Sequence, residues 1–391
     1  MPSRRAARSS PRDVAVLVDT STGWGRRLVH SVINFAHEHG NWRLWVEPAG
    51  RAEAARLPAG WDGHGIIARI ASEQMADRLR STRRPVVNVS GIKLQGADFP
   101  RVSTNYQATA ELAASHFLER GFEHFAYVGP FNLSYVREHR EAFTEAVAAQ
   151  GHHCLYHDFR AGASRHLAWR SHIDALKRWL ADLPRPIGIF TWGTTVGVYL
   201  LHACNEANIR VPDEIAVLGG DDDRLACEAS SPPMSGVIVT SEQIGRTACQ
   251  QLDRMMRGRR ADPHTLIDPI DITTRQSTDV LALRDPELLK ALVILRQNAY
   301  SPMTIDGLMR RIAMSRRSLE RMFQQTFGRT PWEEVRRLRM SRARQLLAQS
   351  DMSIPQVAES CGFATGEHFA TLFKREHDIT PLKYRSKVRG R

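Results

Sequence analysis

Arginines at helical spacing give the clearest chemical signal in this sequence of 391 residues. In residues 315–323 the apolar side chains fall on one side of a helix, which predicts a helix with a single buried face. The opposite face of that helix holds Arg316, Arg317, Glu320 and Arg321. An arginine can donate two hydrogen bonds to O6 and N7 of a guanine in the major groove of DNA. A single pattern of this kind is more often a solvated helix face, so further evidence has to decide.

A second copy of the pattern follows in the chain and favours DNA binding. The apolar run Ile305–Ile312 precedes the arginine-bearing helix, and Ile354–Cys361 repeats that run at an offset of 49 residues. The helix that comes next repeats at an offset of 50, so that Thr365 corresponds to Ser315. Two short helices joined by a tight turn are typical of a helix-turn-helix motif. The sequence thus predicts two such motifs, at about residues 304–327 and 353–376.

Local signals indicate where the helices of these motifs begin and end. Thr304 and Ser315 are expected to cap the N-termini of the two helices in the first copy. Gly362 is expected to end the first helix of the second copy in a left-handed conformation. Residues 332–349 contain neither Gly nor Pro and predict a connecting helix, about 27 Å long. Such a helix would hold two reading helices roughly one duplex turn, about 34 Å, apart.

Residues 301–385 resemble the DNA-binding domain of the AraC/XylS family of transcription regulators. The resemblance is carried by Ile354–Phe363 with its ending Cys361-Gly362-Phe363, by Phe369, by Phe373-Lys374 and by Thr380–Arg385. In that family the exposed residues of the second helix of each motif touch bases. The resemblance gives this role to Arg317, Ser318, Glu320 and Arg321, beside Arg316, and in the second copy to Gly366, Glu367, Ala370 and Thr371, beside His368. The second set has no Arg, Asn or Gln, so the first copy is expected to read sequence and the second to rely more on shape.

The distribution of charge agrees with this interpretation. The net charge is +12. Residues 1–12, a predicted disordered arm, carry four arginines and no acid; residues 13–283 carry 29 basic and 31 acidic residues; residues 284–391 carry 21 basic and 11 acidic residues. The excess of +10 in the last segment coincides with the double motif, as binding to DNA phosphates would require.

Other features of the composition bear on the compartment. The five cysteines are widely spaced and form no CxxC pair, so reduced thiols in a cytoplasmic protein are expected. The arginine-rich start has no apolar stretch behind it, which argues against an export signal. No run of 18 apolar residues occurs, so no membrane span is expected.

The first 280 residues alternate between strand and helix patterns. Strands are predicted at Val14–Val18, Trp42–Val46, Gly65–Ile70, Pro85–Val89, Phe125–Val128, Ile187–Thr191 and Ile215–Leu218. Helices are predicted at Leu28–His39, Ser72–Arg80, Asn105–Arg120, Arg137–Gln150 and Thr195–Ala207. This alternation predicts doubly wound parallel sheets, and about 270 residues suffice for two α/β lobes with a ligand site at the carboxyl ends of the strands.

Residues 13–280 resemble the effector-binding domain of LacI-type repressors and periplasmic sugar-binding proteins. The order of three stretches carries the resemblance: Ala113–Gly129, Pro212–Asp222 and Ser230–Leu252. No LacI-type helix-turn-helix is expected in the 12 residues before the first predicted strand, and the AraC-type pair at residues 281–391 is expected to take its place. This domain order resembles the subgroup of xylose-operon activators. The fold class expected is therefore a two-lobed periplasmic-binding-protein-like domain followed by an all-α domain with two helix-turn-helix motifs.

Polar and aromatic residues at predicted strand ends are the candidates for an effector site. Asp221 matches the position whose carboxylate binds ligand hydroxyls in the family, and a carboxylate can accept two of them. Phe190 or Trp192 would stack on the C–H face of a sugar ring. Ser21, Trp24, Asn105, Arg137 and His139 complete the candidate set.

The candidate site departs from the family at two positions. Thr194 stands where the family often has Asp, and His139 stands where it usually has Arg. Both changes put the subgroup's usual pentose in doubt. Core packing of Phe190, a solvated turn at Asp222 and Asp223, and pairing of Arg137 with Glu141 stay open as structural alternatives.

Catalytic and cofactor motifs are absent from the sequence. His152, His153, Cys154 and His157 could ligate a metal, but alternation along a strand would scatter them over two faces. There is no GxSxG, GxGxxG or P-loop, so no cofactor is expected.

These observations predict a cytoplasmic transcription regulator that is not an enzyme. Its expected partners are promoter DNA, a small sugar with xylose or another pentose favoured, RNA polymerase and a second copy of the chain. Two rivals stay open: an enzyme acting on DNA or sugar with an appended DNA-binding module, and an architectural DNA-binding protein whose α/β part only dimerises.

Overall fold

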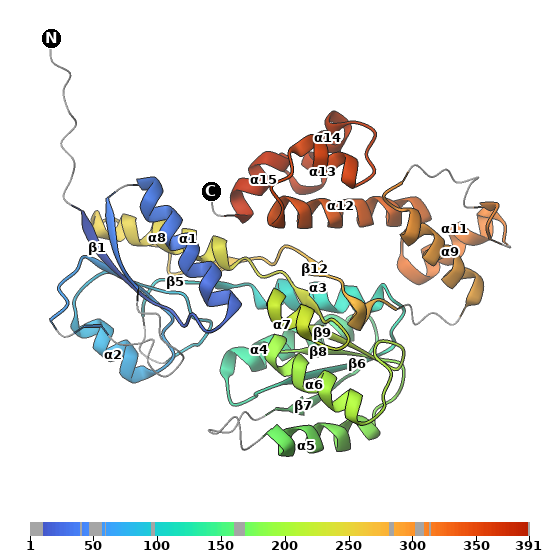
Figure 1. The fold of residues 1–391 in the computed structure, drawn as a ribbon, viewed down its shortest axis with the longest axis horizontal. Helices are drawn as coiled ribbons and strands as arrows, with labels where there is room; N and C mark the ends of the chain where they lie inside the picture. Colours follow the sequence, from blue (N-terminus) through green and yellow to red (C-terminus); the bar gives the residue numbers. More distant parts are fainter. Residues whose placement is uncertain are drawn as a thin grey trace, which may run out of the picture. The chain divides into compact units, whose positions relative to one another are not determined.

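The chain folds into two compact units in a computed structural model (Figure 1). The structure describes residues 11–39, 41–46, 57–58, 60–94, 98–159, 169–280, 285–301, 309–312 and 314–389. The first unit comprises residues 1–105, 240–268 and 388–391, and the second comprises residues 106–239 and 269–387. Each unit contains one six-stranded sheet. Among the described helices, none combines the length and the apolar character that crossing a bilayer requires.

The sheet of the first unit is entirely parallel, in the order β11-β5-β4-β3-β1-β2. Its elements are β1 (Arg12–Leu17), α1 (Gly23–His39), β2 (Trp42–Val46), β3 (Gly65–Ala68), α2 (Glu73–Ser81), β4 (Val86–Asn88), β5 (Arg101–Thr104), α8 (Ser241–Met256) and β11 (His264–Ile267). Alternate residues of β1 face opposite sides. Val14 and Val16 pack in the core that contains α1 and α8, and Ala15 and Leu17 pack in the core that contains α2.

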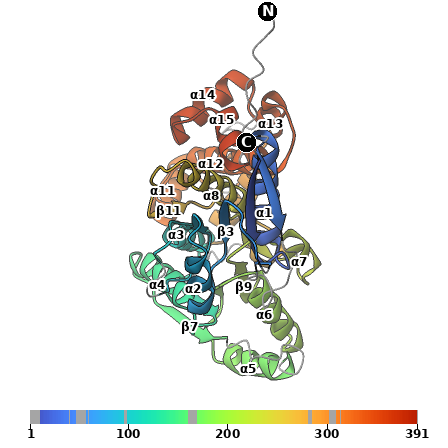
Figure 2. The same ribbon diagram turned by 90° about the vertical axis from the view of Figure 1, so that its left-hand side faces the viewer.

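The sheet of the second unit has the order β12-β10-β9-β8-β6-β7, and all its pairs are parallel except β10 with β12. Its strands are β6 (His124–Gly129), β7 (Cys154–Asp158), β8 (Ile187–Thr191), β9 (Ile215–Gly219), β10 (Ser235–Val237) and β12 (Ile272–Thr273). Its helices are α3 (Tyr106–Leu118), α4 (Ser134–Ala148), α5 (Trp169–Ala181), α6 (Thr194–Glu206), α7 (Arg224–Ala229) and η1 (Gln276–Thr278). The pair α3 and α4 and the pair α5 and α6 cover opposite sides of this sheet (Figure 2).

The second unit also contains the C-terminal helices. They are α9 (Pro286–Asn298), α11 (Arg316–Phe327), α12 (Pro331–Gln349), α13 (Ile354–Ser360), α14 (Gly366–His377) and α15 (Pro381–Val388). Two separate cores hold them together. Leu319, Phe323 and Val335 belong to the first core, and Met340 and Phe373 belong to the second. Helix α12 contributes to both cores, which agrees with its predicted connecting role.

The predicted fold class is confirmed, and the strands at 42–46 and 187–191 have the predicted bounds. The prediction did not include β5, β10, β11 and β12, which have at most four residues each, nor α5, α7, α8 and α9. Helix α8 has an internal Gly245, which lowers helix propensity. A Cβ at Gly245 would lie 2.7 Å from the Leu28 carbonyl oxygen, so close packing on α1 explains this glycine. All five cysteines are free thiols.

Candidate DNA interface and effector site

The second helix of the first motif, α11, presents the predicted arginine face to solvent. Ser315 caps this helix, since its hydroxyl accepts a hydrogen bond from the Ser318 backbone N–H at 3.2 Å. Leu319 and Phe323 are fully buried, which fixes the rotation of the helix. The N-cap predicted at Ser315 is thereby confirmed, whereas Thr304 and the first half of Ile305–Ile312, residues 305–308, lie outside the described residues.

The exposed side of α11 contains two arginines suited to base recognition. Arg316 donates to Glu320 at 2.9 Å, one helical turn away, so these two charges largely neutralise each other. Arg317 and Arg321 are exposed on the same side, and Ser318 is half-buried. The guanidinium groups of Arg317 and Arg321 give this face positive charge and paired N–H donors. That combination can read guanine or bind phosphate.

The second copy builds the same scaffold with a different surface. Thr365 caps α14 by accepting from the His368 backbone N–H at 3.1 Å, and Gly362 has the predicted left-handed conformation with φ at 77°. Along α14, Glu367, His368 and Thr371 are exposed, and Gly366 and Ala370 are half-buried. The positive charge of this copy lies further along the chain, at Lys374, Arg375, Lys383 and Lys387, which are all exposed.

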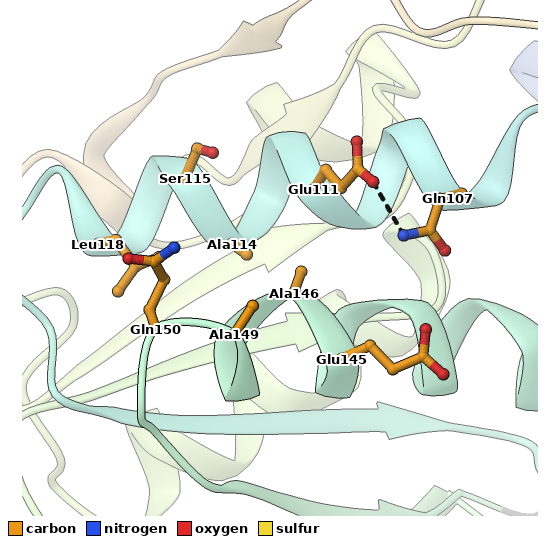
Figure 3. A pocket seen from close by; sticks show the side chains of 9 residues that line it. All are labelled: Gln107, Glu111, Ala114, Ser115, Leu118, Glu145, Ala146, Ala149 and Gln150. Atoms are coloured by element: carbon orange, nitrogen blue, oxygen red, sulfur yellow. Dashed lines mark hydrogen bonds between the residues drawn. The ribbon is translucent and has the colours of Figure 1, made fainter.

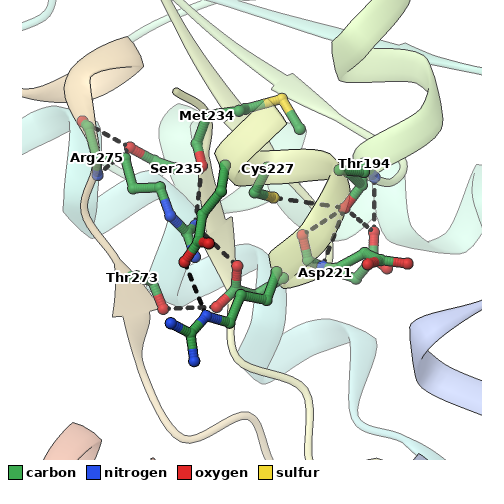
Figure 4. Close-up of polar contacts among 12 residues, drawn as sticks. Thr194, Asp221, Cys227, Met234, Ser235, Thr273 and Arg275 are labelled. Atoms are coloured by element: carbon green, nitrogen blue, oxygen red, sulfur yellow. Dashed lines mark hydrogen bonds and ion pairs between the residues drawn. The ribbon is translucent and has the colours of Figure 1, made fainter. Parts of the chain in front are cut away.

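In the candidate effector site, Asp221 binds the N-terminus of α6 (Figure 4). Its Oδ1 accepts from the Thr194 backbone N–H at 2.6 Å and from the Thr194 hydroxyl at 2.9 Å. A carboxylate is favoured at this place because helix N-termini carry unpaired N–H groups and partial positive charge. Thr194 is therefore the partner that positions Asp221 at the carboxyl ends of β8 and β9.

The neighbouring Asp222 has a structural role. It is 7% exposed and pairs with Arg275 Nη1 at 2.8 Å, and its other oxygen accepts from the Thr273 hydroxyl at 2.7 Å. These bonds tie the end of β9 to β12 and the turn beyond it (Figure 4). The alternative of a solvated turn is thus wrong for Asp222, which is buried and paired.

An aromatic group surrounds Trp192 at the end of β8. Its ring centroid lies 4.9 Å from that of Tyr135, 5.3 Å from that of His139 and 5.8 Å from that of Tyr106. Burial lowers the pKa of His139 to about 3, so its ring is neutral, and it shares a hydrogen bond of 2.8 Å with the Tyr127 hydroxyl. Sequence reasoning missed Tyr106 and Tyr135; their places at the start of α3 and α4 were the available signal.

Two predicted residues of this group are deeply buried. Phe190 is 0% exposed, with the rings of Tyr127, Phe143 and His139 around it, and His139 is 1% exposed. The alternative of Phe190 as a core residue fits this position. Trp192 is half-buried and retains surface for a ligand.

The remaining predicted residues lie in different surroundings. Arg137 is exposed and donates to the Phe131 carbonyl at 2.8 Å, while Glu141 pairs with Arg140, so the alternative pairing of Arg137 with Glu141 is wrong. In the first unit, Asn105 donates to Asp268 at 2.8 Å, and Ser21 donates its backbone N–H to Asp19 at 2.9 Å. Trp24 lies under the Arg69 guanidinium at 5.8 Å.

Two cavities in the described part of the chain contain none of the predicted effector residues: one lies between α3 and α4, and one of about 460 Å³ in the first unit is lined by Asn88, Lys93, Asp98 and Arg101. The groove between α3 and α4 has a volume of about 310 Å³ and is lined by Glu111 and Glu145 with small residues such as Ala146 (Figure 3). His157 packs on Trp179 and His152 on Phe125, and no cluster of three metal-ligating residues occurs in the part of the chain that the structure describes.

Family models match most of the chain. They describe a XylR N-terminal domain over residues 13–112, a periplasmic binding protein-like domain over residues 114–278 and a helix-turn-helix domain over residues 308–387. The three matches follow the order of the two α/β lobes and the C-terminal helices.

Named relatives and a solved structure agree with these matches. The chain is 31% identical over 330 residues to a xylose operon regulatory protein of Haemophilus influenzae, covering 82% of this chain and 84% of that protein. It is 26% identical over 380 residues to the protein of the same name in Escherichia coli K12, covering 95% and 96%. A structure described as the xylose-binding transcription activator XylR covers 97% of this chain and 99% of its own, with a TM-score of 0.63 at 25% identity.

Proposed function

The chain belongs to the family of xylose operon regulatory proteins, and we propose that it activates a sugar-utilisation operon when a small sugar binds its α/β part. It is a sugar-responsive helix-turn-helix transcription regulator. The finer proposal is that the sugar is a pentose, with xylose favoured. The observation that carries this proposal is a doubled helix-turn-helix with an exposed arginine face on the same chain as two lobes of the sugar-sensing type.

On the DNA side, α11 is the main reading helix of the proposal. Arg317 and Arg321 contact base edges, and α14 follows in the next segment of the groove with Glu367 and His368. The exposed lysines of the second copy bind phosphates and fix the register without reading sequence. Two chains acting as a homodimer would read repeated half-sites, from which they contact RNA polymerase.

On the sugar side, the proposal assigns the C–H face of the ring to Trp192, with Tyr106 and Tyr135 as its aromatic neighbours. Asp221 accepts sugar hydroxyls while α6 holds its carboxylate in place. The neutral His139 replaces a charged clamp, so this lobe recognises the ring more through stacking and less through ion-assisted hydrogen bonds. Ser21, Trp24, Asn105 and Arg137 are assigned supporting contacts.

The test is thermal unfolding of the full chain against a panel of pentoses and hexoses, with DNA affinity measured at one fixed salt concentration. A sugar present at 100 times its Kd stabilises the protein by about 2.7 kcal/mol. A pentose is expected to raise the Tm and change the DNA affinity of the wild type. Trp192→Ala should lose the Tm shift, while Trp332→Ala, an exposed tryptophan on α12, should keep it.

The same experiment separates the rivals. Chemical conversion of the sugar during incubation would favour an enzyme with a DNA-binding module. A chain that binds DNA but responds to no sugar would favour an architectural protein, and the proposal would fail.

A further inference from the structure

One side of α12 faces the second α/β lobe and not the DNA-binding cores. This lobe-facing stripe consists of Arg337, Ser341, Arg344 and Gln345, and Glu334 lies one turn before Arg337 and bonds to it. The spacing of three and four residues places these side chains on one face of the helix. Val335, Met340, Ala343 and Leu347 lie in the two helix-turn-helix cores. Because α12 belongs to both cores, a force applied to the stripe acts on both reading helices.

The first anchor of the stripe is Glu119, which directly follows α3. Its carboxylate pairs with Arg337 Nη1 at 2.8 Å and with Arg329 Nη1 at 3.5 Å. Both arginines also contact Glu334, which is 1% exposed. Glu119, Arg329, Glu334 and Arg337 form one ionic network. Among the described members of this network, only Glu119 belongs to the α/β part. The side chains of Glu119, Arg329 and Arg337 are 19–32% exposed. Salt therefore screens the attraction between them less than it screens a fully exposed ion pair.

The second anchor is Asp271, at the start of β12. Its Oδ2 accepts from the Ser341 hydroxyl at 2.7 Å and from Arg344 Nη2 at 2.8 Å. Next to it, Gln345 donates to the Ile272 carbonyl at 2.6 Å. Asp271 is 6% exposed, so a buried carboxylate here is satisfied by groups from α12 and by the Ile272 backbone N–H. A buried charge without such partners is strongly unfavourable.

Asp271 lies next to a place where the chain passes from one unit to the other, and Glu119 lies at the far end of a helix that begins at such a crossing. Within the α/β part these crossings follow residues 105, 239 and 268. Helix α3, which ends beside Glu119, begins at the first crossing. Asp271 lies just beyond the third crossing, and its carbonyl accepts from Ile238 N at 2.7 Å, next to the second crossing. Segments that join two lobes absorb the backbone changes of lobe closure.

The docked arrangement leaves the reading surface accessible. Arg317, Arg321, Glu367, His368 and Thr371 are exposed while the anchors are made. The contact with the lobe therefore sets the orientation of α12 without covering the residues that would read DNA.

We propose that Glu119 and Asp271 are positioning residues that transmit sugar binding to the reading helices by holding α12 on the end of α3 and on the crossing segment before β12. This inference rests on the proposed sugar response and adds the surface through which it acts. Allosteric coupling between two sites commonly changes an affinity by about 5- to 150-fold. Removing the anchor contacts should reduce the factor by which the sugar changes the DNA affinity. The α/β part should still bind the sugar, and the helix-turn-helix part should still bind DNA.

The experiment compares two anchor variants with a matched control in the full chain. Glu119→Gln removes the first anchor, and Ser341→Ala with Arg344→Met removes the second. The control is Arg336→Met, because Arg336 lies on the same helix but pairs with Glu376 of α14 at 3.2 Å. For each protein, the DNA Kd is measured with and without saturating D-xylose, together with the D-xylose Tm shift and hydrogen exchange along α12.

In the wild type and in Arg336→Met, D-xylose is expected to change the DNA Kd by at least about fivefold. In both anchor variants this ratio should fall toward one while the Tm shift persists, and the amides of α12 should exchange faster. Anchor variants that keep the wild-type ratio would overturn the inference. If D-xylose affects neither the Tm nor the DNA affinity of the wild type, the pentose proposal fails. Hydrogen exchange then tests the anchor contacts by themselves, and unchanged exchange along α12 in the anchor variants would overturn the anchoring as well.

Discussion

The two helix-turn-helix copies share a scaffold and differ in almost everything exposed on it. At an offset of 50 residues, Phe323 and Phe373 are both fully buried. Ser315 and Thr365 both cap a 12-residue helix. The helix that follows begins at Pro331 in one copy and at Pro381 in the other. The repeat therefore specifies packing and helix ends, which are what folding requires of each copy.

The copies differ in the residues exposed on the reading helix and in the contacts that hold the helix after it, α12 in the first copy and α15 in the second. The first copy exposes Arg317 and Arg321, where the second exposes Glu367 and Thr371. Glu334 of α12 is buried among arginines, whereas Tyr384, 50 residues later, packs its ring 5.2 Å from that of Phe373. One scaffold is thus held in two ways, by an ionic junction in the first copy and by aromatic packing in the second. The exposed residues are the basis of our proposal that the first copy reads sequence and the second contacts phosphates.

The largest expected effect concerns the reading faces. Arg317→Ala with Arg321→Ala should weaken specific binding to the cognate promoter by tenfold to more than a hundredfold, since one bidentate guanine contact contributes about 1–3 kcal/mol. Glu367→Ala with Thr371→Ala should weaken it by less than about tenfold. Equilibrium binding at fixed salt, with a scrambled duplex as the control, measures both. Equal losses from the two pairs of substitutions would contradict the division of tasks.

The next effect concerns the ionic junction and acid. Burial alone would raise the pKa of Glu334, but the hydrogen bonds from Arg337 and the charges of Arg337, Arg329 and Arg296 outweigh it and lower the pKa to about 2. A carboxyl whose pKa is lower in the folded state stabilises the fold above its unfolded pKa near 4.5, and the contribution disappears as the pH falls toward 2. Its size at neutral pH is up to about 3 kcal/mol.

Denaturant unfolding between pH 7 and pH 3 tests this contribution. The stability difference between the wild type and Glu334→Gln should shrink as the pH falls below about 4.5. Tyr384→Phe is the matched control in the second copy, and its difference should stay constant over the same range. A pH-independent difference for Glu334→Gln would show that the two copies are held by the same kind of packing.

Most of this scaffold could be predicted from the sequence, because its signals are local. Caps such as Ser315, the left-handed Gly362 and the helical spacing of apolar residues each depend on neighbouring positions. The strands β5 and β12 were missed because they are short and partly polar, and their pairing is set by residues far away in the chain. For the same reason the sequence could not reveal that Asp271 meets Ser341 and Arg344, since that contact joins residues about 70 positions apart.

The candidate effector residues were harder to predict than the DNA interface. A strand end identifies Trp192 and Asp221, but the sequence does not tell which side chains point inward at that end. Phe190, two residues before Trp192, lies on the same side of the strand but is fully buried, and Tyr106 and Tyr135 join from the starts of two helices. Only tertiary packing brings these residues together.

The smallest expected effect concerns the end of each reading helix, where the copies use different residues for one backbone conformation. Gly328 has φ at 65° and Asp378, its counterpart at an offset of 50, has φ at 59°. A Cβ at Gly328 would meet nothing within 4 Å, so Gly328→Ala tests backbone conformation alone and should cost about 1 kcal/mol. Asp378→Gly should relieve the same strain and change stability by less than about 1 kcal/mol in the stabilising direction. Urea unfolding of the two variants measures both, and a loss for Asp378→Gly as large as that for Gly328→Ala would mean that the Asp378 side chain stabilises its helix end by more than the left-handed backbone costs.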